Sequence, residues 1–189
     1  MTLPPVPTNR TEAADIANVY ERSIPAQHRL RNGQYYTPFP LCDLILSLAC
    51  HPVENGMPER LLEPGCGAGQ FLVRADERFR QFGRSELGRL GQLQGVELDA
   101  QAAQLAMARL GEQGTNSVLM ADFISPQADV LGLFDVIVGN PPYVRQEHVA
   151  QSAQMDKQAA HAYLQAKYTD YLAAYPQQKA LFSQTADLY

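Results

Sequence analysis

The chain has 189 residues, 46% of them hydrophobic, which suits one domain with a buried core or part of a larger protein. Its formal net charge of −5 argues against a protein that binds nucleic acid through phosphate neutralisation alone. The N-terminus has prolines where a signal peptide needs an apolar run, and no apolar stretch approaches the roughly 20 residues of a membrane span. The three cysteines have no spacing typical of a metal site or a disulfide framework. We therefore expect a cytoplasmic protein with no membrane segment and no metal site.

The predicted elements alternate between helices and strands along the chain. Helices are expected after Thr11 and at residues 40–50, 70–82 and 100–110, and strands at residues 60–64, 93–98, 117–123 and 134–139. Residues 22–40 read as a loop. Strands and helices that alternate at this spacing favour parallel pairing through right-handed crossovers. The sequence thus predicts an α/β fold, with a helical lead-in over 1–30, a core over 31–149 and a helical tail over 150–189.

The first core helix is predicted from the segment PLCDLILSLAC. Its apolar residues follow the spacing of one helix face: Leu41, Leu44, Ile45, Leu48 and Ala49. Pro38 and Pro40 fall in the first turn, where a missing N–H removes no helix hydrogen bond. A later helix, over residues 100–110, is expected to end at Gly111 and Gly114.

A glycine-rich turn joins a strand to a helix in LLEPGCGAGQFL. Gly65, Gly67 and Gly69 form the pattern G-x-G-x-G. Glycines let the backbone turn tightly and let a ligand approach closely, and the following helix offers N–H groups to an anion. Because such turns are common, the loop alone leaves a structural turn and a cofactor site equally open.

Acidic residues end the next two strands. Glu97 ends GVEL, at the position where acids in nucleoside sites accept hydrogen bonds from ribose hydroxyls. Asp99 is expected to cap the next helix, which leaves Glu97 free for a ligand. Asp122 ends the third strand and is followed by Phe123. Since the carboxyl ends of parallel strands meet at one edge, we expect a ligand site there.

The residues around the glycine loop favour one kind of nucleoside cofactor. The pattern EPGCGAG differs from the nicotinamide fingerprint G-x-G-x-x-G. Glu63 would repel a pyrophosphate but tolerates an ammonium group. S-adenosylmethionine has a carboxylate, an amine, a ribose and an adenine, and it has no phosphate. The loop therefore favours S-adenosylmethionine over NAD.

The fourth strand runs into a rigid loop, Asn140-Pro141-Pro142-Tyr143. Prolines end a strand because they donate no ladder hydrogen bond. They also fix their own φ near about −65°, and Pro141 keeps Asn140 extended. Such a loop is either a strand-terminating turn or an active-site loop at the carboxyl edge of the sheet.

The motifs LLEPGCGAGQFL, GVELD, ADF and NPPYVRQE, with NGQYYTP upstream, resemble those of amino-group DNA methyltransferases of the adenine-N6 group. The resemblance covers roughly residues 31–147. It points to the catalytic region of a restriction–modification enzyme, of the type I modification-subunit or fused type IIG kind. It implies a Rossmann-like class I S-adenosylmethionine-dependent methyltransferase fold, whose sheet usually has seven strands where about four are recognisable here. Because the chain ends at TADLY, before the later motifs of that group, we expect a truncated or split region completed by a second segment or subunit.

The resemblance also implies a set of residues that bind the cofactor, S-adenosyl-L-methionine. These are Thr37, Glu63, Gly65, Cys66, Gly67, Glu97, Asp122 and Phe123. Thr37 would contact the methionine part and Glu97 the ribose hydroxyls. Asp122 would face the exocyclic amine of the cofactor adenine, with Phe123 beside it.

The implied partner is double-stranded DNA with the target adenine flipped out of the helix. The implied catalytic residues are Asn140, Pro141, Pro142 and Tyr143. The N6 amine of adenine is a poor nucleophile because its lone pair is delocalised into the ring. The Asn140 side-chain oxygen and the Pro141 carbonyl would accept its two hydrogens and localise the lone pair, as a preorganised loop allows. Tyr143 would stack on the flipped base.

Other substrates fit the same loop. Enzymes that methylate the side-chain amide of glutamine in proteins, and some RNA-modifying enzymes, also hold a planar, conjugated NH2 group. The segment GQYYTP favours DNA adenine over these, while the N4 amine of cytosine poses the same chemical problem and stays open. A non-catalytic remnant that keeps the cofactor fold is an alternative from another class, and an assay of cofactor binding would separate it from an enzyme.

Overall fold

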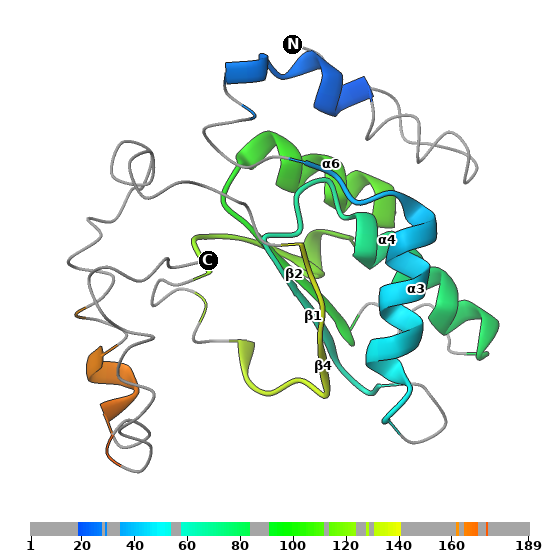
Figure 1. Cartoon of the computed structure of the whole chain (residues 1–189), viewed down its shortest axis with the longest axis vertical. Helices are drawn as coiled ribbons and strands as arrows, with labels where there is room; N and C mark the ends of the chain where they lie inside the picture. Colours follow the sequence, from blue (N-terminus) through cyan, green and yellow to red (C-terminus); the bar gives the residue numbers. More distant parts are fainter. Residues whose placement is uncertain are drawn as a thin grey trace.

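The computed structural model has a four-stranded sheet packed against helices (Figure 1). It describes residues 19–27, 29, 35–53, 58–83, 91–111, 114–123, 128, 131–140, 162, 165–169 and 173. The elements are, in chain order, α3 (Phe39–Cys50), β1 (Leu61–Pro64), α4 (Gln70–Gln81), β2 (Leu93–Glu97), α6 (Ala100–Leu110), the 3-10 helix η2 (Gly114–Asn116), β3 (Val118–Met120) and β4 (Val136–Ile137). The predicted helices and strands of the core are all present in the predicted order. Strands β3 and β4 are shorter than the predicted 117–123 and 134–139, and Gly114 begins η2 instead of ending α6.

The strands of the sheet lie in the order β3-β2-β1-β4, and each neighbouring pair is parallel. Leu61 of β1 pairs with Leu93 on one side and with Val136 on the other. The chain therefore moves outward from β1 to β3 and then returns past β1 to β4. Open parallel sheets bind ligands where the strand order reverses, at the carboxyl ends of the strands. The predicted α/β fold with parallel pairing is confirmed, and the reversal lies at β1.

An apolar core fills the space between the sheet and helices α3, α4 and α6. Phe71 and Phe79 of α4 are fully buried against Leu61 and Leu93 of the sheet. Each such side chain contributes about 1.5–3 kcal/mol to folding when it leaves water. This packing holds the strand ends in fixed relative positions, which a site made from several strands requires.

Helix α3 has a buried face that differs from the apolar stripe in its sequence. The residues buried in the core are Cys42, Leu46 and Cys50. The leucines of the predicted stripe are instead 46%, 55% and 66% exposed: Leu41, Leu44 and Leu48. Apolar residues surround most of this helix, and buried cysteine behaves as a small hydrophobic side chain. The spacing therefore predicted the helix correctly but not the face that packs.

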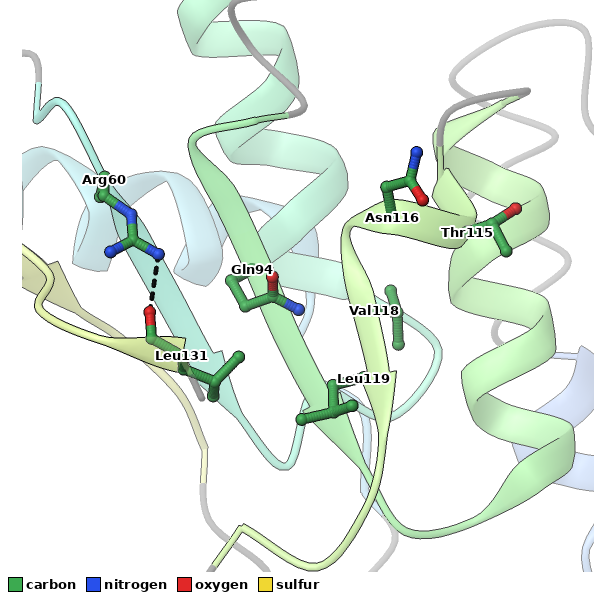
Figure 2. Close-up of a pocket in the computed structure, with 7 residues that line it drawn as sticks. All are labelled: Arg60, Gln94, Thr115, Asn116, Val118, Leu119 and Leu131. Atoms are coloured by element: carbon green, nitrogen blue, oxygen red, sulfur yellow. Dashed lines mark hydrogen bonds between the residues drawn. The ribbon is translucent and has the colours of Figure 1, made fainter. Parts of the chain in front are cut away.

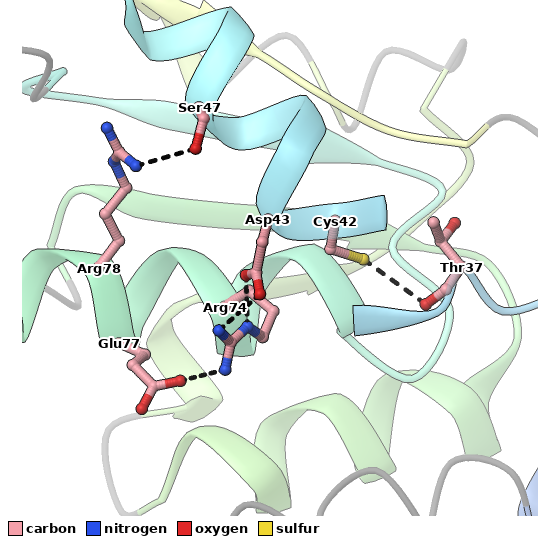
Figure 3. Close-up of polar contacts among 7 residues, drawn as sticks. All are labelled: Thr37, Cys42, Asp43, Ser47, Arg74, Glu77 and Arg78. Atoms are coloured by element: carbon pink, nitrogen blue, oxygen red, sulfur yellow. Dashed lines mark hydrogen bonds and ion pairs between the residues drawn. The ribbon is translucent and has the colours of Figure 1, made fainter. Parts of the chain in front are cut away.

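Charged side chains join α3 to α4 along their outer surface (Figure 3). Arg74 Nε and Nη2 donate to the two carboxylate oxygens of Asp43, at 2.6 and 2.7 Å. Arg74 also donates to Glu77, one turn further along its own helix. Arg78 Nη1 donates to Ser47 Oγ at 3.4 Å. A bidentate arginine–carboxylate pair is geometrically specific, so these contacts fix the orientation of α3 against α4.

Residues 19–23 are helical and pack on α6 at the top of the molecule (Figure 1). The buried side chains of this contact are Tyr20, Ile24, Ala68, Ala102 and Leu105. Residues 26–27 and 29 are also helical, so the prediction of a loop over 22–40 was wrong in part. The N–H of Arg29 donates to the carbonyl of Pro25 at 3.0 Å, as in a turn of helix. Proline suits the start of such a turn because its φ is already fixed near the helical value. Residues 11–18 of the predicted first helix lie outside the described residues.

Three cysteines lie in the interior of the molecule. Cys42, Cys50 and Cys66 are buried free thiols. Burial raises the pKa of each, that of Cys42 to about 12, so they stay protonated and unreactive near neutral pH. In the part of the chain that the structure describes, no helix is long and apolar enough to cross a membrane.

Candidate active site

The candidate site residues lie at the carboxyl ends of the four strands. The glycine loop follows β1, and Glu97 ends β2. Asp122 follows β3, and Asn140 follows β4. Because the strands are parallel, these groups lie along one edge in the strand order β3-β2-β1-β4. The predicted placement of three acidic or glycine-rich strand ends at a single edge is confirmed, whereas their roles in binding stay predictions.

The glycine loop has a backbone that side chains would disturb. Gly65 and Gly67 have φ values of 64° and 53°, in the left-handed region that favours glycine. The N–H of Cys66 donates to the carbonyl of Val96 at 2.9 Å, which joins the loop to β2. A Cβ on Gly95 of β2 would lie 2.8 Å from Cys66 Sγ, closer than real Cβ atoms approach. Glycines on both the loop and the strand thus allow the loop to lie directly on the sheet.

Glu63 of β1 lies beneath the start of α4, with only 3% of its surface exposed. Its Oε2 accepts a hydrogen bond from the N–H of Leu72 at 3.0 Å, and the N–H of Phe71 also stabilises its charged form. The helix N-cap, Gly69, has no side chain to do this. Burial nevertheless raises the pKa of Glu63 well above its usual value. A strand residue therefore caps the helix from below.

Arg109, in the last turn of α6, holds the loop from the other side. Its Nη2 donates to Gln70 Oε1 at 2.7 Å, and its Nη1 donates to the carbonyl of Ala68. The guanidinium lies 5.8 Å from the centre of the Phe39 ring. Burial lowers its pKa to about 10, and the charge of Glu63 opposes this shift. No sequence pattern indicates this role, because a basic residue near a helix C-terminus is ordinary.

Glu97 connects the glycine loop to the start of α6. Its Oε2 accepts from the N–H of Gly67 at 2.7 Å, and its Oε1 accepts from the N–H of Asp99 at 2.8 Å. Asp99 accepts from the N–H of Ala102 at 2.8 Å, which confirms it as the helix cap. The expectation that capping by Asp99 leaves Glu97 free was wrong, because both Glu97 oxygens already accept backbone hydrogen bonds. Each carboxylate oxygen has a second lone pair, so Glu97 still has acceptor capacity for a ligand.

Two tyrosines that the sequence analysis did not single out lie beside the loop. A Cβ on Gly67 would lie 2.7 Å from Cε1 of Tyr36, so the ring lies directly against that glycine. The Tyr36 ring stacks on Tyr20 with centroids 6.4 Å apart. Tyr20 donates from its hydroxyl to Asp99 Oδ1 at 3.3 Å, and the N–H of Tyr36 donates to Glu21 Oε2 at 3.1 Å. Contacts between segments far apart in the chain create this arrangement, and no local pattern could have indicated it.

Thr37 follows Tyr36 and is 7% exposed. Its carbonyl accepts a hydrogen bond from Cys42 Sγ at 3.5 Å, across the first turn of α3 (Figure 3). Thr37 is therefore placed next to a ring that touches the glycine loop, on the side of β1.

Exposed apolar residues accompany the acids at the ends of β2 and β3. Leu98, directly after Glu97, is 41% exposed, and Phe123, directly after Asp122, is 39% exposed. The two strands are neighbours, and Glu97 pairs with Met120. An apolar side chain thus stands beside each acid. The sequence analysis predicted Phe123 as a site residue but not Leu98. Leu98 directly follows an acidic strand end, as Phe123 does, and this position could have indicated it.

Asn140 lies half-buried beyond β4 and close to the glycine loop. The N–H of Val138 donates to the carbonyl of Leu62 at 2.9 Å, which keeps β4 aligned with β1. A Cβ on Gly139 would lie 3.2 Å from the carbonyl oxygen of Pro64. The strand end that carries Asn140 therefore runs alongside the residue that precedes Gly65. Pro141, Pro142 and Tyr143 lie outside the described residues.

A cavity of about 290 Å³ lies toward the amino ends of the strands (Figure 2). Its lining residues are Arg60, Gln94, Thr115, Asn116, Val118, Leu119 and Leu131. Arg60 precedes β1 and Asn116 precedes β3, and Arg60 Nη2 donates to the carbonyl of Leu131 at 2.8 Å. Open parallel sheets bind ligands at the opposite ends of their strands, so this cavity is separate from the candidate site.

Residues 12–181 of the chain match the N-6 DNA methylase family. The chain belongs to this family. The match includes the glycine loop, the acidic ends of β2 and β3, and the loop that begins at Asn140. The four-stranded parallel sheet and the order of these motifs agree with the resemblance seen in the sequence.

Several relatives are type II methyltransferases. M.XamI of Xanthomonas campestris pv. amaranthicola is 30% identical over 131 residues, which are 67% of this chain and 23% of the relative. M.BstVI of Geobacillus stearothermophilus is 34% identical over an alignment of 147 residues that covers 64% of this chain and 26% of the relative. The chain thus spans about a quarter of the length of these curated relatives. A cryo-EM structure of a DrdV–DNA complex has the same fold, with a TM-score of 0.53 and 14% identity over 87% of this chain and 18% of that one.

Proposed function

We propose that this chain binds S-adenosylmethionine and methylates the N6 amino group of adenine in DNA, as the catalytic part of a restriction–modification methyltransferase. One observation carries the proposal. In a member of the N-6 DNA methylase family, the glycine loop, Glu97, Asp122 and Asn140 lie along one edge of a parallel sheet. This edge has groups for a nucleoside at β2 and β3 and an amide side chain at β4.

The donors of the glycine loop favour a cofactor without phosphate. In dinucleotide sites the pyrophosphate binds the free N–H groups at the start of the helix. Here Glu63 accepts from the N–H of Leu72, and Glu97 accepts from the N–H of Gly67. A pyrophosphate would therefore find these donors occupied and two carboxyl groups nearby. S-adenosylmethionine instead has an ammonium group and hydroxyls, which can donate to carboxylates.

The strand ends fit the nucleoside part of this cofactor. The second lone pairs of the Glu97 oxygens accept from the ribose hydroxyls, and Asp122 faces the exocyclic amine of the cofactor adenine. Leu98 and Phe123, 41% and 39% exposed, would offer apolar contacts to the adenine ring. Thr37 lies on the methionine side of the site. When bound, the cofactor supplies a methyl group attached to a positively charged sulfur.

Asn140 and the loop after it act on the target amine. The Asn140 side-chain oxygen and the Pro141 carbonyl accept the two hydrogens of the N6 amine, which localises the nitrogen lone pair. Tyr143 stacks on the flipped adenine. The amine nitrogen would bond to the methyl carbon as the carbon–sulfur bond breaks, which would release S-adenosylhomocysteine. No general base would be needed before this, since the extra proton on nitrogen would pass to solvent afterwards. The position of Asn140 beside the residue before Gly65 supports this, because the amine must meet the methyl group at the glycine loop.

The test measures methyl transfer and cofactor binding in the same preparations. The chain is incubated with methyl-labelled S-adenosylmethionine and duplex DNA, and the label is located by nucleoside analysis. We expect N6-methyladenine from the unchanged chain and none from Asn140→Ala. The affinity of Asn140→Ala for S-adenosylhomocysteine should stay within about twofold of that of the unchanged chain. The proposed contact of Asn140 is with the target amine, so its loss should lower the rate of methyl transfer and not cofactor binding.

The matched control is Asn116→Ala, which removes the same side chain from the cavity at the opposite end of the sheet. It should retain both methylation and binding. If the label is found in N4-methylcytosine, the substrate is cytosine and not adenine. Methylation by Asn140→Ala at nearly the unchanged rate would exclude the proposed role of Asn140. A chain that neither binds S-adenosylhomocysteine nor labels DNA would overturn the proposed function.

A further inference from the structure

The hydroxyl of Tyr36 is a buried polar group beside the glycine loop, where Arg109 Nε also has no partner among the described residues. Within the described part of the chain, Tyr36 Oη is buried and makes no hydrogen bond. Its ring lies against Gly67, at a position that a Cβ on that glycine would occupy. A buried hydroxyl without a partner is unfavourable, and native structures rarely keep one unless it serves a ligand, a water molecule or a strained state.

The surroundings of Tyr36 make its hydroxyl a donor. Burial raises the pKa of Tyr36 far above its usual value, and the nearby hydroxyl of Tyr20 and the carboxyl groups of Glu97, Asp99 and Glu21 raise it further. The phenol therefore stays protonated at any ordinary pH. A protonated phenol that lacks a partner can donate to an acceptor on a bound molecule.

Other contacts hold the Tyr36 ring in place. Its N–H donates to Glu21 Oε2 at 3.1 Å, and its ring stacks on Tyr20. Tyr20 in turn donates to Asp99 Oδ1 at 3.3 Å, and Asp99 caps α6. The helical residues 19–23 are thus connected to the glycine loop through two aromatic rings. A side chain fixed in this way presents its hydroxyl at a defined position.

We propose that the Tyr36 hydroxyl donates a hydrogen bond to the carboxylate at the amino-acid end of the bound cofactor. The inference rests on the proposed function. With the nucleoside at the ends of β2 and β3, the amino-acid end extends toward β1, where Tyr36 touches Gly67. Glu97, which accepts from the N–H of Gly67, lies near this end, and its carboxylate repels a second one. A neutral donor facing the cofactor carboxylate offsets that repulsion, and Tyr36 is such a donor.

The test compares two ligands that differ only at the amino-acid end. Isothermal titration measures the binding of S-adenosylhomocysteine and of 5′-methylthioadenosine, which keeps the nucleoside but has no carboxylate. Tyr36→Phe keeps the ring and removes the hydroxyl. It should weaken S-adenosylhomocysteine binding about tenfold or more, as expected for a hydrogen bond to a charged group. It should leave the affinity for 5′-methylthioadenosine within about twofold of the unchanged chain.

Tyr35→Phe is the control, because Tyr35 is the adjacent residue and is 47% exposed. It should change neither affinity. The thermal midpoint of ligand-free Tyr36→Phe should equal or exceed that of the unchanged chain, since an unpaired buried hydroxyl is removed. Equal losses for both ligands, or no loss for either, would overturn the assignment to the carboxylate while leaving the proposed function in place. If the unchanged chain binds neither ligand, both the role of Tyr36 and the proposed function are wrong.

Discussion

Two glutamates at the strand ends, the buried Glu63 and the half-buried Glu97, have structural partners as well as predicted ligands. Glu63 accepts from the N–H of Leu72, and Glu97 accepts from those of Gly67 and Asp99. The sequence located both acids correctly, because each ends a strand before a turn. It could not show their backbone partners, since these depend on how the loop folds back over the sheet. Residues that bind a cofactor can therefore also determine the shape of the loop around it.

The burial of Glu63 has a consequence for stability that depends on pH. Because burial raises the pKa of Glu63 above its usual value of about 4.5, the folded chain binds the proton more tightly than the unfolded chain. Between the usual and the raised pKa, the folded state holds more protons, so the free energy of unfolding falls as pH rises. Glu63→Gln removes this contribution while its amide oxygen can still accept from Leu72.

Urea unfolding from about pH 4.5 to 8 measures this effect as a difference between the two chains. The unchanged chain should lose more stability over this range than Glu63→Gln. Glu97, whose pKa is also raised, stays in both chains, so the difference reports Glu63 together with its repulsion from Glu97. Parallel stability curves would mean that Glu63 titrates alike in the folded and unfolded states.

Helix α3 shows what a local pattern predicts about an element and what it does not. The spacing of its leucines predicted helix over residues 40–50, and the structure has it at Phe39–Cys50. The buried face depends on where α4 and the sheet lie, which the spacing does not contain. Leu44 belongs to the predicted stripe and is 55% exposed, whereas Leu46 lies outside that stripe and is 2% exposed.

The two leucines give a matched pair of substitutions on one helix. Leu46→Ala should lower the free energy of unfolding by about 2–5 kcal/mol, because it leaves a cavity in the core. Leu44→Ala should change it by no more than about 0.5 kcal/mol, since its side chain already contacts solvent. Chemical denaturation of both variants measures these two changes in the free energy of unfolding. Losses of similar size would mean that the outer face of α3 is covered in solution.

The candidate site forms only when all four strands are paired in the sheet. Parallel pairing and a common edge followed from the alternation of strands and helices. The position of β4 beside β1 did not follow, because pairing between residues about 75 positions apart has no local signature. That pairing places Asn140 beside the glycine loop. The domain limits at residues 30 and 149 stay predictions, as do the roles of Pro141, Pro142 and Tyr143.

A ligand that contacts three strand ends should stabilise the whole fold. The glycine loop, Glu97 and Asp122 follow β1, β2 and β3, so they form one site only while the sheet is intact. S-adenosylhomocysteine at about 100 times its dissociation constant should therefore add about 2.7 kcal/mol to the free energy of unfolding. NAD at the same concentration should add nothing, because Glu63 and Glu97 occupy the N–H groups that a pyrophosphate needs.

Thermal unfolding with and without each ligand tests this whole-molecule prediction. Asn140→Ala should keep the full rise in unfolding temperature caused by S-adenosylhomocysteine, because the proposed contact of Asn140 is with the target base and not with the cofactor. Glu97→Ala should lose most of it, since a hydrogen bond to a charged group is worth about 1.5–3 kcal/mol. Comparing each variant with its own ligand-free form removes the separate effect of Glu97 on the loop. An equal rise with NAD, or an undiminished rise in Glu97→Ala, would contradict the assignment of this edge to a phosphate-free nucleoside cofactor.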